Sequence, residues 1–164
     1  MSENYAPSTI REAVPADYPA LASISDEVHA LHAAAHPAIF RPVGSGSSLP
    51  QAYFDDLLAK DTSTIQVAEV AGTIAGFAII EVFDAPPFEI FVPHRTVFIN
   101  SMVVTAEQRG KGIGRTLVDA AMGWGRARGA TALELVVWEF SQAALAFYER
   151  FGLATIHRTM RLEL

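Results

Sequence analysis

Apolar residues repeat at helical spacing in four stretches of the chain. In the first, Leu21, Ile24, Val28 and Leu31 line one face of a helix that we expect to run from Asp17 to about Ala35. Proline and glycine predict where the helices end. The remaining helices are expected at Leu49–Lys60, at Ile113–Arg128 before Gly129, and at Ser141–Phe151 before Gly152.

Runs of β-branched and alternating apolar residues separate these helices and predict strands. The tight turn at Ala71 and Gly72 joins two of them into a hairpin, and residues 41–50 and 84–95 are expected to be irregular. The predicted strands are Ser8–Ala13, Ile65–Val70, Thr73–Val82, Thr96–Val104, Ala132–Val137 and Thr155–Leu162. The order, roughly βααβββαβαβ, predicts an α/β (α+β) fold: a central mixed β-sheet flanked by helices on both faces.

Composition narrows the class of protein. The chain has 164 residues, 51% of them hydrophobic and 18% charged, which indicates one well-packed domain. Cysteine is absent, so disulfides, thiol nucleophiles and Cys-ligated zinc or iron–sulfur sites are excluded. The first residues do not resemble a signal peptide, and no window approaches the roughly 18 apolar residues of a membrane span. We expect a soluble, cytoplasmic single domain with no membrane partner.

Charge is divided unevenly along the chain, whose net charge is −6. Residues 1–100 hold 4 basic and 12 acidic side chains, whereas residues 101–164 hold 8 basic and 6 acidic ones. The acidic total argues against nucleic-acid binding, which needs a basic surface. A basic second part beside an acidic first part suits two ligands of opposite charge, although a random surface distribution gives the same counts.

The segment from Asn100 to Arg115 carries the clearest chemical signal. A predicted strand leads into glycines 110, 112 and 114, and a predicted helix begins at once. Glycine lets the backbone approach a ligand, and a helix N-terminus presents unpaired N–H groups, so the segment predicts an anion site. Three cations, Arg109, Lys111 and Arg115, favour a phosphate ligand. The nucleotide patterns GxxxxGK[ST] and GxGxxG are both unmet here.

At this point the sequence resembles the GCN5-related N-acetyltransferases (GNAT). Gln108–Gly114, reading QRGKGIG, matches the family's Q/R-x-x-G-x-G/A signature. The likeness continues through 130–138 and through 146–153, where AFYERFGL resembles the family's helix with a tyrosine. It is specific over residues 97–162 and weak before residue 60. It implies an acyl-CoA N-acyltransferase fold with residues 1–95 on the acceptor side and residues 96–164 binding acetyl-CoA, without a metal.

The resemblance assigns cofactor contacts residue by residue. It implies that the loop backbone holds the pyrophosphate of acetyl-CoA, that the preceding strand pairs with the pantetheine arm, and that one N–H there polarises the thioester carbonyl. Ser141 stands where the family often has an asparagine, and serine is also a good helix N-cap. The implied contacts are Met102, Val103, Val104, Arg109, Gly110, Lys111, Gly112, Ile113, Gly114, Arg115 and Ser141.

Candidate catalytic residues are fewer. By the resemblance, Tyr148 is the general acid that protonates the departing thiolate; its spacing from Leu145 and Phe151 also suits a packed aromatic. Glu81 is the base we prefer, and Asn100 could position a water that relays the proton. Other carboxylates and a histidine nearby remain alternatives, each also readable as an ordinary loop charge: Asp84, Glu89 and His94.

Histidines on the first helix leave three readings open. His29, His32 and His36 share one helical face, which could hold a metal, line an acceptor pocket, or simply be exposed. Pro37 biases His36 away from helical geometry, and no carboxylate completes a metal site. We therefore place His29, His32 and Phe40 in the acceptor-binding region and expect no metal.

These observations predict an N-acetyltransferase that transfers the acetyl group of acetyl-CoA directly to a primary amine. The acceptor is expected to be a cationic small molecule or a peptide N-terminus. A non-catalytic acyl-CoA-binding module is the alternative from another class, and transfer to a hydroxyl or of a longer acyl chain stays within the same fold. The resemblance also allows a homodimer.

Overall fold

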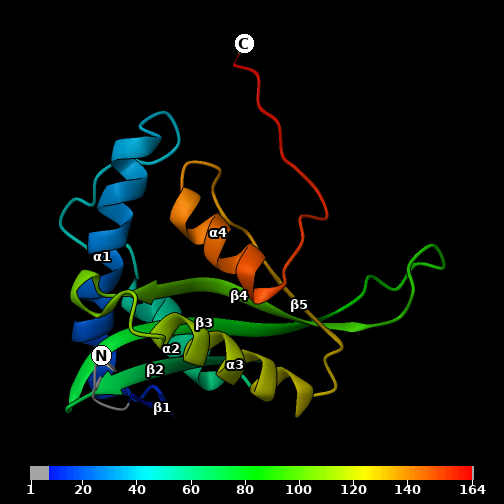
Figure 1. Cartoon of the computed structure of the whole chain (residues 1–164), viewed down its shortest axis with the longest axis horizontal. Helices are drawn as coiled ribbons and strands as arrows, with labels where there is room; N and C mark the ends of the chain where they lie inside the picture. Colours follow the sequence, from blue (N-terminus) through cyan, green and yellow to red (C-terminus); the bar gives the residue numbers. More distant parts are fainter. Residues whose placement is uncertain (1–7, 164) are drawn as a thin grey trace, which may run out of the picture.

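A five-stranded mixed sheet forms the centre of the protein (Figure 1). The computed structural model describes residues 8–163, so the expectation for the first seven residues lies outside it. The strands lie in the order β1-β2-β3-β4-β5; every neighbouring pair is antiparallel except β4 and β5, which are parallel. Their bounds are β1 Thr9–Glu12, β2 Ser63–Val70, β3 Thr73–Asp84, β4 Arg95–Val104 and β5 Ala132–Leu135.

Helices cover both faces of this sheet, as predicted. On one face, α1 and α2 pack through Leu21, Phe54 and Leu57 against β2 and β3. On the other face, α3 packs through Leu117 and Trp124, and α4 lies over the same core. The helix bounds are α1 Tyr18–Ala35, α2 Gln51–Ala59, α3 Ile113–Arg126 and α4 Gln142–Phe151. None of the described helices is long and apolar enough to cross a bilayer.

Asn100 forms a bulge in β4, which the sequence did not reveal. Ile80 pairs with Ile99 and Ile79 pairs with Ser101, so Asn100 has no partner on β3. The pairing of β4 with β5 ends one residue earlier, at Ile99 and Leu135. Because β4 continues to Val104 alongside β3 alone, β4 and β5 diverge at the bulge, and the β5-facing edge of residues 101–104 has no strand partner there.

The prediction of a last strand at Thr155–Leu162 is wrong. Residues 153–163, the tail, form no strand, and Ile156, Met160 and Leu162 are 73–89% exposed. The alternation that predicted a strand is present, but a strand also needs a partner, and the tail leaves α4 without pairing with the described sheet (Figure 1).

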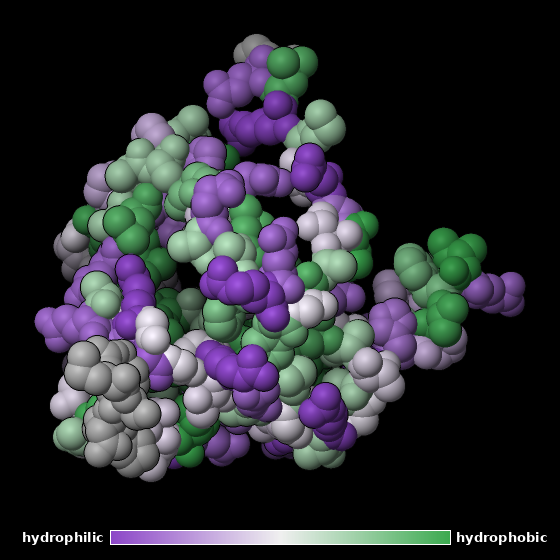
Figure 2. Space-filling model, in the orientation of Figure 1, coloured by the Kyte–Doolittle hydropathy of each residue, from purple (hydrophilic) through white to green (hydrophobic). Residues whose placement is uncertain are grey.

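The irregular segment predicted at 84–95 projects from the sheet. Residues 85–94, the arm, connect β3 to β4 and extend beyond the ends of both strands (Figure 1). Apolar side chains cover much of its surface in Figure 2, and Ile90 and Val92 are 86% and 78% exposed. The arm and the tail therefore leave large apolar surfaces uncovered.

Candidate functional site

The glycine loop between β4 and α3 forms an open cradle at the N-terminus of α3. A short 3-10 turn, Ala106–Gln108, leads into Gly110 and Gly112, whose φ angles of 76° and 84° lie in the left-handed region that glycine favours. A Cβ at either glycine would meet nothing within 4 Å, so the space beside the backbone is open. Gly112 is the N-cap of α3, whose first N–H groups lack intrahelical partners. These features fit a phosphate-bearing ligand.

Three cations, Arg109, Lys111 and Arg115, belong to the loop and to the first turn of α3. Arg109 donates from Nε to the Val104 carbonyl oxygen at 3.0 Å, which holds its guanidinium over the end of β4. Lys111 donates to the Gln108 side-chain oxygen at 3.2 Å. Arg115 is largely exposed on the first turn of α3 and lies 3.9 Å from the Asp119 carboxylate. The cradle thus combines backbone donors with positive charge.

An apolar contact joins the cradle to α4. A Cβ at Gly114 would lie 3.4 Å from the Phe147 ring and 3.9 Å from the Met102 methyl group, so α3, β4 and α4 meet there. Met102 and Val104 face the side of the sheet that α3 and α4 cover, whereas Val103 is buried in the core on the α1–α2 side. Ser141 occupies the predicted N-cap position of α4, but its side chain makes no capping hydrogen bond.

Tyr148 lies on α4 beside the same contact. Its ring packs against Phe147, with 5.1 Å between the centroids, and against the α3-side core. Burial raises the pKa of Tyr148 to about 12, so its hydroxyl holds a proton at neutral pH. Within residues 8–163 no group hydrogen-bonds to that hydroxyl, which is therefore available to a ligand.

Glu81 and Asn100 come together across β3 and β4. The Asn100 side-chain amide donates a hydrogen bond to the Glu81 carboxylate. Side chains alternate along a strand, and Ile79 belongs to the α1–α2 core, so Glu81 lies on that face too. Tyr53 on α2 lies near Glu81. Burial is the main cause that raises the pKa of Tyr53, and the negative charge of Glu81 is the second. Glu81 therefore approaches the divergence of β4 and β5 from the face opposite Tyr148.

The other base candidates are placed differently. Arg95 binds the Asp84 carboxylate with two hydrogen bonds of 2.7 and 2.9 Å and lowers the Asp84 pKa, so that carboxylate is already occupied. Glu89 and His94 lie on the arm, outside β3 and β4, and His94 is bonded to the Val92 carbonyl at 2.7 Å. Of the four candidates, only Glu81 is paired with a residue of the bulge.

An aromatic cluster that the sequence did not reveal joins α1 to the loop after β5. The His32 ring meets Phe40, Trp138 and Phe140 at centroid distances of 5.3–6.4 Å, and its Nδ1 lies 2.9 Å from the Val28 carbonyl oxygen. His36 packs on the same Trp138 and Phe140 rings.

His29 packs its ring edge against Phe40 and bonds to the Arg41 carbonyl at 2.7 Å. The predicted acceptor residues thus lie together, with Trp138 and Phe140 as added members. In the sequence, the only signal for Trp138 and Phe140 was that two aromatic residues follow shortly after the strand β5. About a hundred residues separate the two parts of the cluster, so the contact could not be read from local spacing.

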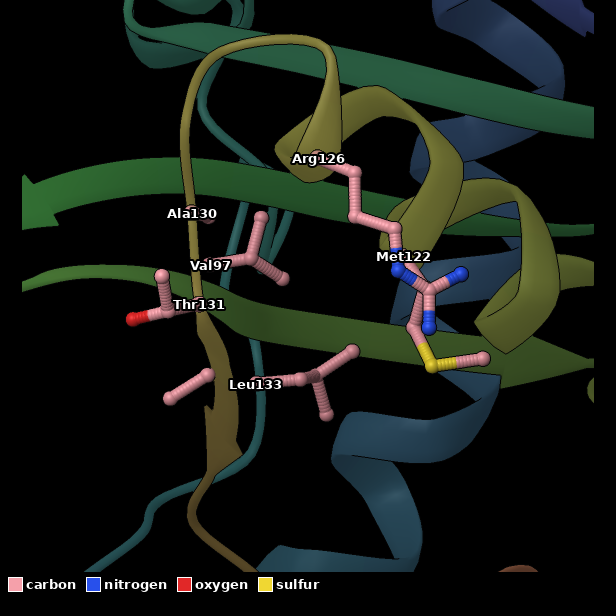
Figure 3. A pocket seen from close by; sticks show the side chains of 7 residues that line it. Val97, Met122, Arg126, Ala130, Thr131 and Leu133 are labelled. Atoms are coloured by element: carbon pink, nitrogen blue, oxygen red, sulfur yellow. The ribbon is translucent and has the colours of Figure 1, made fainter.

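A separate hollow of about 130 Å³ lies at the other end of α3 (Figure 3). Val97, Met122 and Leu133 form its apolar part, and the Arg126 side chain runs along α3 toward Met122 (Figure 3). None of the predicted site residues lines it.

Comparison with known proteins agrees with the family resemblance that the glycine loop carries. The model of the acetyltransferase (GNAT) family matches residues 26–153. An uncharacterized N-acetyltransferase of Archaeoglobus fulgidus is 33% identical over 96 residues, which cover 58% of this chain and 63% of that protein, less than two thirds of its length. The L-methionine sulfoximine/L-methionine sulfone acetyltransferase of Pseudomonas aeruginosa is 27% identical over 145 residues, covering 88% of this chain and 79% of that protein.

Solved structures show the same fold. A mutant of the BH1408 protein from Bacillus halodurans matches with a TM-score of 0.90 and 30% identity, covering 95% of this chain and 99% of that one. A predicted acetyltransferase from Clostridium acetobutylicum, solved with acetyl-CoA, matches with a TM-score of 0.72 and 21% identity over 96% of each chain.

Proposed function

This chain belongs to the acetyltransferase (GNAT) family, and we propose that it transfers the acetyl group of acetyl-CoA to the primary amine of a small molecule. The observation that carries the proposal is the open glycine cradle at the start of α3, which follows β4, the strand that diverges from β5. A solved structure of the same fold contains acetyl-CoA, which agrees with that reading.

The chain's own groups suit each part of acetyl-CoA. Backbone N–H groups at Gly110, Gly112 and the start of α3 would bind the pyrophosphate, with Arg109, Lys111 and Arg115 adding charge. The β5-facing edge of residues 101–104 would pair with the amide-bearing arm as a strand does. An N–H on that edge would stabilise the charge that develops on the thioester oxygen.

Glu81 and Asn100 would prepare the amine. An alkylammonium with a pKa of about 10.4 must lose a proton before it can attack, which costs roughly 4–5 kcal/mol at pH 7. The Glu81 carboxylate would accept that proton through a water held by the Asn100 amide, on the α1–α2 face of the sheet. The amine would therefore enter from that face.

Tyr148 would act on the leaving group from the opposite face. Its pKa of about 12 lies well above the roughly 8.5 of a thiol, so complete transfer of its proton to the thiolate would cost about 5 kcal/mol. Its acid role is therefore a hydrogen bond to the departing sulfur. The ammonium group loses two protons on the way to the amide: Glu81 takes the first before the attack, and the second leaves the nitrogen after the attack and ends on the departing sulfur.

A small cationic amine is the acceptor class that the residues favour. Glu81 supplies negative charge, and the ring edges of His29, His32 and Phe40 stand with Trp138 and Phe140 beside α1. A similar protein is named for acetylating methionine sulfoximine and methionine sulfone, both small amines. These points support a small molecule over a peptide N-terminus.

The test is a calorimetric titration with acetyl-CoA followed by free-thiol release against a panel of small amines and short peptides. Binding with thiol release on one class of small amines is the expected result. Binding without release on any acceptor would favour the non-catalytic acyl-CoA-binding module. Failure to bind acetyl-CoA would contradict the assignment of the cradle.

A further inference from the structure

An apolar strip, formed by Phe98 and Phe83, lies beside Glu81 on the sheet face that carries α1 and α2. Phe98 on β4 is the direct partner of Glu81 on β3, and paired residues of antiparallel strands point to the same face. Phe83 comes two residues after Glu81 on β3, so it lies on that face too. The two rings meet edge to face, with 6.3 Å between their centroids. Two aromatic rings therefore border the carboxylate assigned as the base.

The α1–α2 core ends before it reaches the strip. Phe77 and Ile79, earlier on β3 and on the same face, are buried in that core, whereas Phe83 is 51% exposed. On the opposite face of the same strand, Val82 is still buried in the α3-side core. The sheet is therefore uncovered at Phe83 only on the face that carries Glu81.

The arm continues the apolar surface away from the bulge. β3 ends one residue after Phe83, and the arm projects from that end of the sheet (Figure 1). Phe88 and Phe91 on the arm are both exposed, and their rings pack together with 6.5 Å between the centroids. Apolar side chains therefore follow one another outward from Glu81, through the strip and onto the arm.

Carboxylates stand on both sides of Phe98. Phe98 pairs with Glu81 on β3 and with Glu134 on β5, so the three residues form one row across the sheet. Leu133 and Leu135 pack on the α3-side core, so Glu134 between them faces the same side as Glu81. An aromatic ring between two carboxylates suits a ligand that is both cationic and apolar, and disfavours an anionic one such as an acidic lipid surface.

We propose that the acceptor is an amphipathic primary amine whose apolar tail lies across Phe98 and Phe83 toward the arm. The inference rests on the proposed function, which places the reacting amine at Glu81. Two residues along a strand span about 7 Å, so an alkyl tail that starts at Glu81 can reach Phe83. The aromatic cluster lies on the other side of the bulge, because Trp138 follows the last pair of β4 and β5 whereas Phe98 precedes it. The strip therefore selects the tail, and the cluster borders the amine end.

The test measures acetyl transfer to butylamine, hexylamine and octylamine, each below the concentration at which it forms micelles. We expect kcat/KM to rise at least about tenfold from butylamine to octylamine, because each buried methylene group can add up to about fourfold. 6-Aminohexanoate, which would bring a carboxylate onto the strip, should be poorer than hexylamine by at least about tenfold. Calorimetry of the same amines with the CoA-bound protein measures the tail contact independently of turnover.

Phe83→Ser should reduce the ratio of the octylamine and butylamine kcat/KM values to less than about threefold, because the tail loses half of its aromatic contact. Val14→Ser is the matched control. It removes an apolar side chain that is 49% exposed, against 51% for Phe83, but that lies after β1 at the edge of the sheet. This control should leave the ratio unchanged, and both variants should keep the far-UV circular dichroism of the wild type.

Equal transfer to all three amines would overturn the inference and leave the proposed function intact. No transfer to any amine, with calorimetric affinities that still rise with chain length and fall in Phe83→Ser, would contradict the proposed function and support the strip as an amine site. Affinities that are independent of chain length would overturn the strip. Loss of self-association or of vesicle binding in Phe83→Ser, with an unchanged chain-length dependence, would assign the strip to a second copy or a lipid surface and overturn the inference too.

Discussion

Glu81 on β3 accepts a hydrogen bond from the side-chain amide of Asn100, the residue that bulges out of β4. The bulge marks the point where the pairing of β4 with β5 stops. The carboxylate that we propose as the base is thus hydrogen-bonded to the residue at which β4 and β5 part. A change in either residue should affect the reaction before it affects the fold.

Replacing Glu81 by glutamine should lower kcat/KM by about 100-fold at pH 7, in the range typical of a lost general base. The loss should shrink as pH rises toward 10, because more of the amine is then already deprotonated. Steady-state rates measured from pH 6 to pH 10 test this. Glu89→Gln, an exposed carboxylate on the arm, is the control and should leave the profile unchanged; a profile of Glu81→Gln parallel to wild type would remove Glu81 from the base role.

Gly112→Asp should weaken CoA binding by about 100-fold, since a carboxylate would occupy the path of the pyrophosphate at the α3 N-terminus. Gly129→Asp is a matched control at the other end of α3, with a φ of 82° against 84° for Gly112 and equally open space. Calorimetry with CoA should show near-normal affinity for the control. Equal losses in both variants would indicate backbone strain and not the loss of an anion site.

Tyr148→Phe should lower kcat by roughly 10–100-fold and leave the CoA dissociation constant within about threefold. The raised pKa of Tyr148 keeps its hydroxyl protonated below about pH 12, so wild-type activity should show no decline near pH 10 from this group. Tyr18→Phe removes another hydroxyl, which donates to the Leu49 carbonyl at 3.0 Å, and should cost stability without lowering kcat. An unaltered kcat in Tyr148→Phe would exclude the acid role.

Asp17→Asn should lower the free energy of unfolding by about 2 kcal/mol at pH 7. Asp17 is 8% exposed and accepts hydrogen bonds of 2.7 and 2.9 Å from Arg11, which lower its pKa below 3.8. Its contribution is complete above that value and is lost as pH falls through the lowered pKa, so the difference between variant and wild type should fade below pH 4.

Urea unfolding at pH 7 and at pH 2–3 measures this change. Asp84→Asn breaks a similar arginine pair whose carboxylate is 68% exposed, and it should change stability much less than Asp17→Asn does. A pH-independent effect of Asp17→Asn would mean that packing, not the ionised pair, is responsible.

Two glycines of α3 should respond oppositely to alanine. A Cβ at Gly125 would overlap a Val97 methyl group on β4, so Gly125→Ala should destabilise the fold by about 2–3 kcal/mol. Gly123 has open space around it, and Gly123→Ala should stabilise the helix by about 0.5–1 kcal/mol. Urea unfolding distinguishes the two, and Val97→Ala should partly rescue Gly125→Ala. Equal effects would contradict the close packing of α3 on β4.

The glycine loop and the helices could be predicted because their signals are local. Gly112 comes directly before the helical apolar pattern that begins at Ile113, so a few neighbouring residues specify both the turn and the start of the helix. The same holds for the end of α1, where Pro37 indicated the departure of His36 from helical geometry. The tail shows the limit of such reasoning, because its alternation is a property of the segment whereas a strand is a property of a pair.

The sequence alone determined the order of the helices, the first five strands, the glycine cradle and the class of ligand that the cradle suits. These features could be predicted because spacing, capping and glycine conformation act over a few neighbouring residues. Only the tertiary structure decided that Asn100 bulges and meets Glu81, that Tyr148 faces the opposite side of the sheet, and that His32 packs on Trp138. Those relationships join residues from 19 to about a hundred positions apart, and register, burial and shared cores set them, not the local pattern.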